Sequence, residues 1–473
     1  MSRRPEEGAL ALVLHSHMPY VEGFGTWPFG EEWLWEAVAC VYLPLLDLLD
    51  GAPVTLGLTP VLCDQLDAMR GEAGERYLSF LRDVRAPIHA EDAEGLERGG
   101  EPELAAEVRR AAGDYTTAER AFEERGRDLV SAFAALERVE LWTSAATHGL
   151  LPLMATDAGM RLQVATGTAA HLHRFGRWEG GFWLPECAYV PGLERELADH
   201  GVRAFCVDQS GVPGFDQLAP VATEAGPVAV PIHWEMVELV WDKAGYPAHD
   251  SYRNYWGRTV HDLRPWSNAG RPYDPAAALA LAREHARDFV SRAAERLEGG
   301  GLMCCALDTE LLGHWWYEGL AWLGAVFEEA EAQGVRLVTV SEGIELAEPV
   351  ERPLAPSTWG HGKDFVTWDA PPVAEMAFDA RAAELRTVAA LASHGASSDA
   401  AKRAVRELLA MQASDWPFMI TRDMAADYPV ERMRQHGAAL DDALTALTDS
   451  GAAPEPRLRG LAPHLDLSPL TTP

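Results

Sequence analysis

The sequence predicts a parallel α/β architecture followed by an all-helical C-terminal domain. Between residues 9 and 341, short apolar runs alternate with stretches of helical periodicity, which is typical of parallel sheets built from strand-helix units. From about residue 371 to 448 the helical period continues without interruption. The seven or eight predicted strands favour a barrel over a small open sheet, although a doubly wound sheet remains compatible with the pattern.

The individual elements follow from these periods. Strands are predicted at residues 9–15, 54–62, 139–146, 180–183, 202–208, 228–234, 302–307 and 335–341. Helices are predicted at residues 32–49, 157–175, 191–200, 274–297 and 320–333. The domains expected are a barrel (1–63 and 139–356), an inserted helical subdomain (64–138), a helical C-terminal domain (357–450) and a poorly ordered, proline-rich tail (451–473).

Composition limits the partners. The 473 residues include 40 basic and 72 acidic side chains, for a net charge of -32. Such a surface repels phosphate backbones and anionic membranes, so we expect neither nucleic acid nor membrane as a partner. A neutral substrate meets no such barrier. The oligomeric state is not predictable from these data.

Cysteine usage and the N-terminus indicate a reducing compartment. None of the six cysteines forms a CxxC pair, and most lie in apolar runs. The apolar run Ala9 to Leu14 is too short for the core of a signal peptide, and no run has the length of a membrane span. We therefore expect a cytoplasmic protein.

Polar side chains follow four of the predicted strands. His15 and His17 end the first, and His148, Glu186 and Asp308 follow three later ones. If the strands are parallel, these groups meet on one rim of the barrel. Each group also has a simpler interpretation. The histidines could be satisfied core groups or metal ligands, and Asp308 and Glu310 could cap the next helix.

Two carboxylates among histidines and tryptophans are typical of glycoside chemistry. One carboxylate attacks the anomeric carbon and the other protonates the leaving oxygen, which for retention of configuration requires about 5–5.5 Å between them. Indole faces stack on the apolar face of a sugar ring. Several of the 16 tryptophans lie beside the strand ends, namely Trp27, Trp33, Trp183, Trp315 and Trp316.

Successive motifs then resemble one known family. They read HSHMPY from His15, WPFGEEW from Trp27, HGLLP from His148, WLPE from Trp183 and DTELLGHWW from Asp308. The resemblance continues through Trp359, Trp368 and the segment QASDWPF, residues 412–418. These motifs, in this order and over nearly the whole chain, resemble glycoside hydrolase family 57, and most closely its 1,4-α-glucan branching enzymes.

The resemblance implies a (β/α)7 barrel with an inserted helical subdomain and a helical C-terminal domain. It also implies a retaining mechanism without metal or other cofactor, acting on an α-glucan. By motif position Glu186 would be the nucleophile and Asp308 the general acid/base. Sugar hydroxyls of the donor would bind His15, His17 and His148, and the glucan groove would be lined by Trp27, Trp359, Trp368 and Trp416. The other substrate-binding candidates in these motifs are Trp33, Trp183, His314, Trp315 and Asp415.

One segment departs from the family pattern. The stretch between Glu186 and Asp308 is short, whereas the branching enzymes carry there a mobile loop with a tyrosine that keeps water from the intermediate. The corresponding loop would be residues 241–256, with Tyr246 as its tyrosine. A truncated lid would favour hydrolysis over transfer.

Three alternatives remain open at this stage. An α-amylase or a 4-α-glucanotransferase would use the same carboxylate pair. A metal-dependent carbohydrate deacetylase would use His15, His17, His148 and Asp308 as ligands. A glucan-binding protein without activity would keep the tryptophans but need neither carboxylate.

Overall fold

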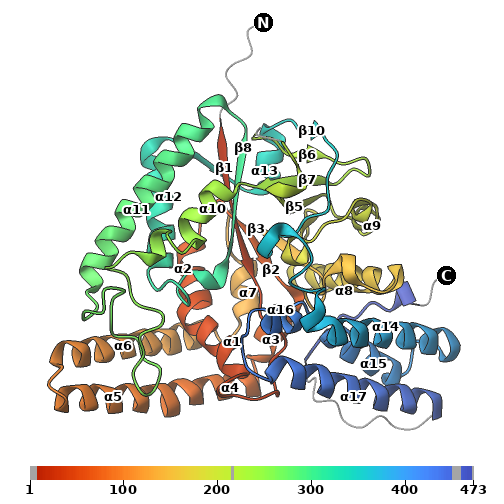
Figure 1. Cartoon of the computed structure of the whole chain (residues 1–473), viewed down its shortest axis with the longest axis horizontal. Helices are drawn as coiled ribbons and strands as arrows, with labels where there is room; N and C mark the ends of the chain where they lie inside the picture. Colours follow the sequence, from red (N-terminus) through yellow and green to blue (C-terminus); the bar gives the residue numbers. More distant parts are fainter. Residues whose placement is uncertain (1–7, 215–217, 450–459, 471–473) are drawn as a thin grey trace, which may run out of the picture.

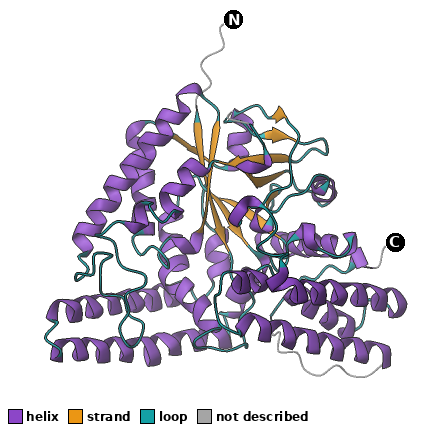
Figure 2. Ribbon diagram, viewed as in Figure 1, coloured by secondary structure: helices purple, strands orange, loops and turns teal. Residues whose placement is uncertain are grey.

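A closed barrel of seven parallel strands forms the centre of the protein. The computed structural model describes residues 8–214, 218–449 and 460–470. The ring runs β1-β2-β3-β4-β5-β7-β8 and closes through the pairing of β8 with β1. Its strands are β1 (Ala9–Ser16), β2 (Thr55–Leu58), β3 (Glu140–Ser144), β4 (Gly181–Trp183), β5 (Ala204–Asp208), β7 (Val228–Ile232) and β8 (Leu302–Asp308). The predicted parallel (β/α)7 barrel is confirmed (Figure 2).

Strand β1 is the best-connected strand of the barrel. It pairs with β8 from Ala9 to His15, and its other edge is shared between β9 (Arg336–Val338) and β2. All eight residues of β1 are buried, because strands of a parallel barrel are covered on both faces. The register pairs His15 with Asp308, so both side chains leave the barrel at the same level. Two short strands missed in the sequence, β6 (Val221–Ala222) and β10 (Val350–Glu351), pair outside the ring.

Three predicted strands are shorter than expected. The strand predicted at 335–341 is only Arg336–Val338 (β9), because helix α13 (Val340–Leu346) begins at Val340. Residues 54–62 were predicted as one strand, but the strand ends at Leu58 and helix α3 (Pro60–Ala68) begins at Pro60. Proline lacks an N–H and suits the first turn of a helix, which is why the apolar run changes conformation there. Trp234 similarly starts helix α10 (Trp234–Trp241) instead of ending β7.

Helices cover the barrel and extend from it on two sides (Figure 1). Around the barrel lie α1 (Glu31–Ala37), η1 (Val38–Tyr42), α2 (Leu43–Leu49), α8 (Asp157–Phe175), α9 (Leu193–Asp199), α11 (Pro275–Arg296), α12 (Gly319–Gln333) and α13 (Val340–Leu346). One extension contains α4 (Glu72–Ser79), η2 (Phe80–Arg85), α5 (Ala86–Arg98) and α6 (Pro102–Glu124), whereas α7 (Leu129–Ala134) lies beside the barrel and packs on α2, α3 and α8. The other contains α14 (Ala374–His394), α15 (Asp399–Met411), α16 (Asp415–Thr421) and α17 (Tyr428–Asp449).

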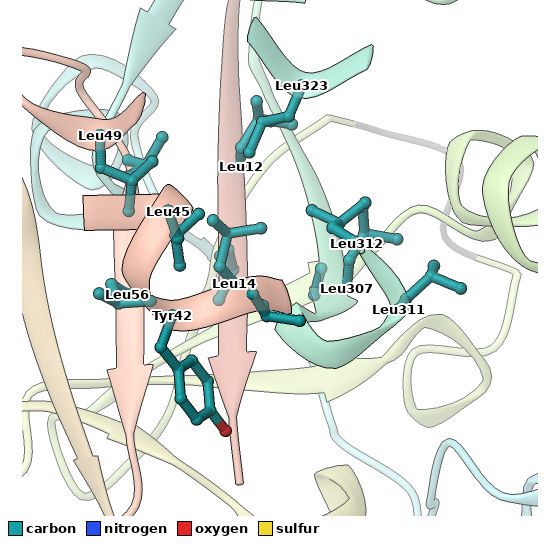
Figure 3. Close-up of a cluster of buried hydrophobic side chains, with 14 of the residues drawn as sticks. Leu12, Leu14, Tyr42, Leu45, Leu49, Leu56, Leu307, Leu311, Leu312 and Leu323 are labelled. Carbon is teal, nitrogen blue, oxygen red and sulfur yellow. The ribbon is translucent and has the colours of Figure 1, made fainter. Parts of the chain in front are cut away.

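The core lies between the barrel and its helices. Leucines of β1 and β8 pack with Leu45 and Leu49 of α2 and with Tyr42 of η1 (Figure 3). All six cysteines are free, and five of them are buried. Within the described residues no helix combines the length and the apolar character required to cross a membrane.

Part of the C-terminal tail is packed, contrary to the expectation of disorder. The backbone N–H of Ala462 donates to Asp64 (2.7 Å), and the N–H of Gly460 donates to the Tyr20 hydroxyl (2.9 Å). Leu461 and Leu470 are buried in a cluster shared with α8 and α15. Proline content therefore misled the prediction for residues 460–470, because apolar side chains anchor this segment. The remainder of the predicted tail, 451–459 and 471–473, lies outside the described residues.

Candidate active site

The C-terminal ends of the strands open into a cavity of about 1510 Å³. His15 and His17 reach it from the end of β1, Glu186 from the turn after β4 and Asp308 from the end of β8. His148 reaches it from the turn after β3. The four strand ends singled out in the sequence therefore face one cavity, as expected for the carboxyl ends of parallel strands.

Glu186 lies in a strained turn. It belongs to the short 3-10 helix Pro185–Cys187, where its φ of 59° is left-handed, and His148 has a φ of 58°. Non-glycine residues adopt this region at a cost of about 1–2 kcal/mol, usually where function fixes the side chain. The carboxylate is fixed by two donors. Trp359 Nε1–H donates to Oε2 (3.0 Å), and the Ser414 hydroxyl donates to Oε1 (3.2 Å).

A hydrogen-bond chain fixes the protons of two histidines. Because the Ser414 hydroxyl donates to Glu186, it accepts from Nδ1–H of His148 (2.9 Å). Nε2 of His148 is then the acceptor for Nε2–H of His15 (3.0 Å). Burial first, and then the neighbouring His17, hold the pKa of both histidines well below the usual value, so both are neutral. The ring of His15 stacks on Trp183, with 4.4 Å between centroids.

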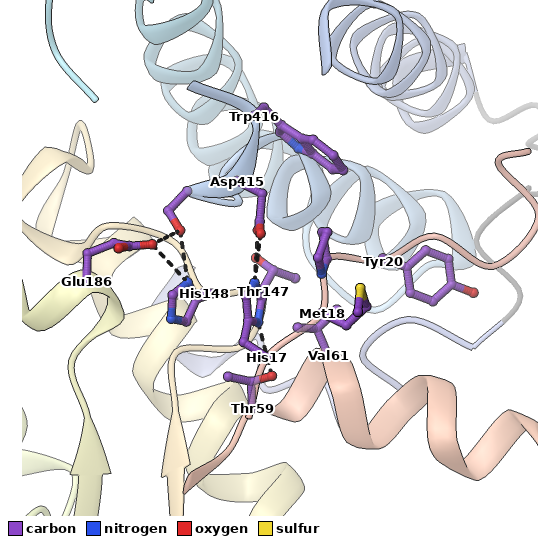
Figure 4. Close-up of polar contacts among 12 residues, drawn as sticks. His17, Met18, Tyr20, Thr59, Val61, Thr147, His148, Glu186, Asp415 and Trp416 are labelled. Atoms are coloured by element: carbon purple, nitrogen blue, oxygen red, sulfur yellow. Dashed lines mark hydrogen bonds and ion pairs between the residues drawn. The ribbon is translucent and has the colours of Figure 1, made fainter. Parts of the chain in front are cut away.

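His17 is the charged member of the three histidines. Its Nε2–H donates to Asp415 (3.0 Å) and its Nδ1–H donates to Thr59 (3.2 Å), as Figure 4 shows. Burial acts to lower the pKa of His17, but the charge and hydrogen bond of Asp415 outweigh it, so the pKa is raised. The His17 ring stacks on His148 at 4.0 Å. A cation therefore lies beside the carboxylates of the cavity.

Asp308 has a different environment from Glu186. No described residue donates a hydrogen bond to either of its carboxyl oxygens. Burial, and then the charges of Glu310 and Glu186, hold its pKa well above the usual value, so the group keeps its proton. Burial also raises the pKa of Glu186, to about 7, while the Trp359 and Ser414 donors lower it. One carboxyl is thus suited to donate a proton and the other, once ionised, to act as a nucleophile.

The comparisons with known proteins agree with this geometry. The model of glycosyl hydrolase family 57 matches residues 11–355. The chain belongs to glycosyl hydrolase family 57. A second model, described as the C-terminal part of 1,4-alpha-glucan branching enzyme, matches residues 378–464.

Individual relatives of this family 57 chain span most of its length. A probable 1,4-alpha-glucan branching enzyme of Mycobacterium tuberculosis is 33% identical, over 94% of this chain and 93% of that protein. A 1,4-alpha-glucan branching enzyme of Thermococcus kodakarensis is 33% identical over 91% of this chain and 72% of that protein. The crystal structure of a family 57 branching enzyme from Pyrococcus horikoshii has a TM-score of 0.90 at 29% identity, covering 98% and 97% of the two chains.

Several predicted substrate-binding residues line the cavity of this family 57 barrel. Besides the three histidines, the residues that line it are Trp27, Trp33, His314, Trp315, Trp359 and Asp415. Trp27 and Trp315 are 62% and 40% exposed and form part of the rim. Their roles in sugar binding stay predictions.

Four predicted residues do not line this cavity. Trp183, Trp368 and Trp416 are at most 2% exposed, so the expectation that Trp368 and Trp416 line the groove is wrong. Trp416 donates its indole N–H to the carbonyl of Ala410 (2.7 Å). Trp183 stacks on the ring of His15. Large indoles close to a site can be core residues, and sequence alone does not separate the two cases.

Tyr246 also lies away from the cavity. Its hydroxyl donates to Asp288 (2.6 Å), and its ring stacks on His285 at 4.4 Å. It is only 9% exposed. Other parts of the predicted loop 241–256 do line the cavity, namely Trp241, Asp242 and residues 253–255, together with Trp234 and Glu238 of α10. In this structure Tyr246 is not placed to shield an intermediate.

The sequence reasoning missed two groups that hold the nucleophile and its neighbours. Ser414 bonds both Glu186 and His148, and Thr59 bonds His17. Ser414 lies in the segment QASDWPF next to Asp415, which was a signal that could have included it. Thr59 lies inside the strand predicted at 54–62, so nothing in the sequence marked it as a site residue. A third group, Glu310, was considered only as a helix cap.

The predicted metal-ligand set does not form. Among the described residues, the donor atoms of His17, His148 and Asp415 lie within 4.8 Å of one another, and Asp308 is not part of this group. His17 already pairs with Asp415, and His148 Nδ1 is engaged by Ser414. The donors are therefore arranged as a proton-fixing network around Glu186, and the deacetylase ligand set that includes Asp308 was wrong.

Proposed function

We propose that this protein is a 1,4-α-glucan branching enzyme that works by retention through a glycosyl-Glu186 intermediate. The observation that carries the proposal is the pairing of two carboxyl groups on one cavity with opposite environments. Glu186 has two donors that favour its ionised form, and Asp308 has none and keeps its proton. Membership of family 57 and the two branching-enzyme relatives support the choice of an α-glucan substrate.

The reaction then follows from these two side chains. Glu186 attacks C1 of a donor glucose unit while Asp308 gives its proton to the departing O4, so that the α-1,4 bond breaks and a glycosyl ester forms. Asp308, now ionised, takes the proton of a 6-hydroxyl on an acceptor chain, and that oxygen displaces Glu186. The product carries an α-1,6 bond with retained configuration, and both side chains return to their initial states.

Hydrolysis is the second candidate, because Tyr246 lies outside the cavity. If water replaces the acceptor hydroxyl, the same carboxylates give an α-amylase, and a 4-hydroxyl acceptor gives a 4-α-glucanotransferase. The fold of an α-amylase from Thermotoga maritima is similar (TM-score 0.82, 24% identity), which shows the fold alone. A protein that only binds glucan would need neither an ionised Glu186 nor a protonated Asp308.

Amylose incubation separates these candidates. Branching lowers the absorbance of the iodine complex, leaves the number of reducing ends unchanged, and yields short chains after enzymatic debranching. Hydrolysis raises the number of reducing ends and gives nothing to debranch. We expect Glu186→Gln and Asp308→Asn each to abolish both outcomes with unchanged circular dichroism. Wild-type turnover by either variant would contradict the assignment.

A cytoplasmic location is part of this proposal. It is supported by the six free cysteines. The acidic surface also argues against nucleic acid as a partner.

A further inference from the structure

Glu310 is a further carboxylate on the wall of the cavity, and neighbouring residues engage only one of its oxygens. Oε1 accepts hydrogen bonds from the hydroxyl of Tyr42 and from the backbone N–H of His17 (3.2 Å). No neighbouring described residue donates to Oε2, and the other hydrogen bond to this carboxylate comes from the backbone N–H of Glu310 itself. Because Glu310 lines the cavity, this second oxygen is available to a ligand. The carboxylate is thus held in one position, and its Oε2 can accept a further hydrogen bond from a ligand.

The backbone of Glu310 is fixed as firmly as its side chain. It lies in the 3-10 turn Thr309–Leu311 that directly follows β8, two residues after Asp308. Thr309 between them is fully buried, and its Oγ1 accepts from the Ser16 hydroxyl at the end of β1 (2.8 Å). This contact anchors the turn to the barrel, so Asp308 and Glu310 reach the same cavity as Glu186.

Structural explanations do not account for Glu310. It does not cap an α-helix, because the next one, α12, begins only at Gly319 and is preceded by Glu318. It forms no ion pair with a described lysine or arginine. The only nearby cation among the described residues is His17, which already pairs with Asp415, so burial of this carboxylate has a desolvation cost that packing does not recover. Such a group in a cleft is a candidate for function.

We propose that Glu310 is a third catalytic carboxylate, whose Oε2 accepts a hydrogen bond from a hydroxyl of the reacting sugar. This inference rests on the proposed function. In the transition state positive charge develops on the sugar ring, and hydrogen bonds to its hydroxyls strengthen. A fixed negative group beside that ring stabilises the transition state more than the ground state.

The charges around Glu310 are consistent with a role in binding a sugar hydroxyl and with an effect on the proton of Asp308. The titratable groups that face Glu310 are Tyr42 from η1, His17 from the turn after β1 and Asp308 from β8, while Asp415 of α16 acts through His17. Burial raises the pKa of Glu310 to about 7, and the Tyr42 hydrogen bond and the His17 charge oppose that increase. After burial, the charge of Glu310 is the largest cause of the raised pKa of Asp308.

The first test replaces the charge without changing the shape. Glu310→Gln keeps an oxygen for Tyr42 and His17, and Glu345→Gln on the exposed part of α13 is the matched control. With amylose as substrate and the fall in iodine absorbance as readout, we expect Glu310→Gln to lower kcat by about 100-fold or more and to change KM by less than about threefold. Because Asp308 loses a neighbouring negative charge, the alkaline limb of the pH–kcat/KM profile should move to lower pH.

A second variant keeps Glu310 and removes one of its donors. Tyr42→Phe deletes a hydrogen bond that lowers the pKa of Glu310, so the pH at which Glu310 ionises rises. We expect the acid limb of the same profile to move to higher pH, with activity recovering as pH increases. A role in folding alone would lower the thermal unfolding midpoint without moving either limb.

The outcomes separate this inference from the proposed function. Wild-type protein that neither branches nor cleaves α-glucan would overturn the proposed function itself. Active wild type together with a Glu310→Gln variant within threefold in kcat, or with unmoved pH limbs, would overturn only the role of Glu310. The role of Glu310 would be established by a loss of kcat in Glu310→Gln and by shifted pH limbs in Glu310→Gln and Tyr42→Phe. The control Glu345→Gln should then match wild type.

Discussion

Replacing Trp359 by phenylalanine tests how the nucleophile is held. The indole Nε1–H of Trp359 donates to Oε2 of Glu186 (3.0 Å), and phenylalanine keeps an aromatic ring there but has no donor. A hydrogen bond to a charged group contributes about 1.5–3 kcal/mol, and about 1.4 kcal/mol corresponds to one pH unit. The bond lowers the pKa of Glu186, which burial has raised to about 7. Its loss should therefore move the acid limb of kcat/KM upward by about one pH unit or more.

The shift gives a distinctive pH dependence. With a pKa of about 7, half of Glu186 is ionised at pH 7. With a pKa about one unit higher, only about a tenth is ionised. The variant should thus be about fivefold less active than wild type at pH 7 and close to wild type at pH 9. The rate at which the absorbance of the amylose–iodine complex falls, measured from pH 5 to 9.5 for wild type and variant, gives the two profiles.

The matched control is Trp178→Phe. Trp178 precedes β4 at the opposite end of the barrel, and its indole donates only to the carbonyl of Gly181 (2.9 Å). This variant should keep the wild-type pH profile even if it loses stability. An acid limb of Trp359→Phe that stays in place, or moves to lower pH, would refute the reasoning about Glu186.

Three further predictions concern stability and the histidine network. Asp308→Asn should abolish activity yet raise the thermal unfolding midpoint at neutral pH. In the folded protein the pKa of Asp308 is raised above its value of about 4 in the unfolded chain, so this group lowers the stability of the fold as pH rises above about 4. An unchanged unfolding midpoint at pH 7 would contradict this prediction. Asp415→Asn should reduce the free energy of unfolding by about 1–3 kcal/mol below pH 6 and by less as pH rises. The reason is that Asp415 raises the pKa of His17, and their ion pair stabilises the fold only while His17 is charged. Equal losses at pH 5.5 and 9 would argue against a charged His17. Leu461→Ala should cost about 2–3 kcal/mol in denaturant unfolding, whereas a loss under about 0.5 kcal/mol would mean that residues 460–470 are not anchored as the structure shows.

The sequence was most informative where local pattern and topology coincide. Helix α8 begins and ends where its periodicity predicts, Asp157–Phe175, because a Thr156 N-cap and Gly176 with φ 66° define its ends. The rim groups were also predictable, because the end of a buried parallel strand points toward one face of the barrel. Strand β2 was overpredicted, since an apolar run does not distinguish a strand from the first turns of a buried helix.

The contacts between distant segments were not predictable. That Trp183 packs behind His15 and that Trp416 is core depends on tertiary packing, which residue type does not reveal. Glu310 looked like a capping residue because Asp-Thr-Glu often begins a helix. Only the approach of Tyr42, 268 residues away in sequence, shows that its side chain turns into the cavity.

The C-terminal helices are part of the catalytic site rather than a cover over it. Ser414 and Asp415, at the start of α16, supply the hydroxyl that bonds Glu186 and the carboxylate that charges His17. The same segment is tied to the barrel by its backbone, since the N–H of Ser414 donates to the carbonyl of His148 (3.2 Å). Without these contacts Glu186 loses a donor and His17 loses the partner that keeps it protonated. A barrel expressed without residues 357–473 should therefore be inactive even if it folds, and activity restored by adding the helical segment in trans would show that the two parts form one site.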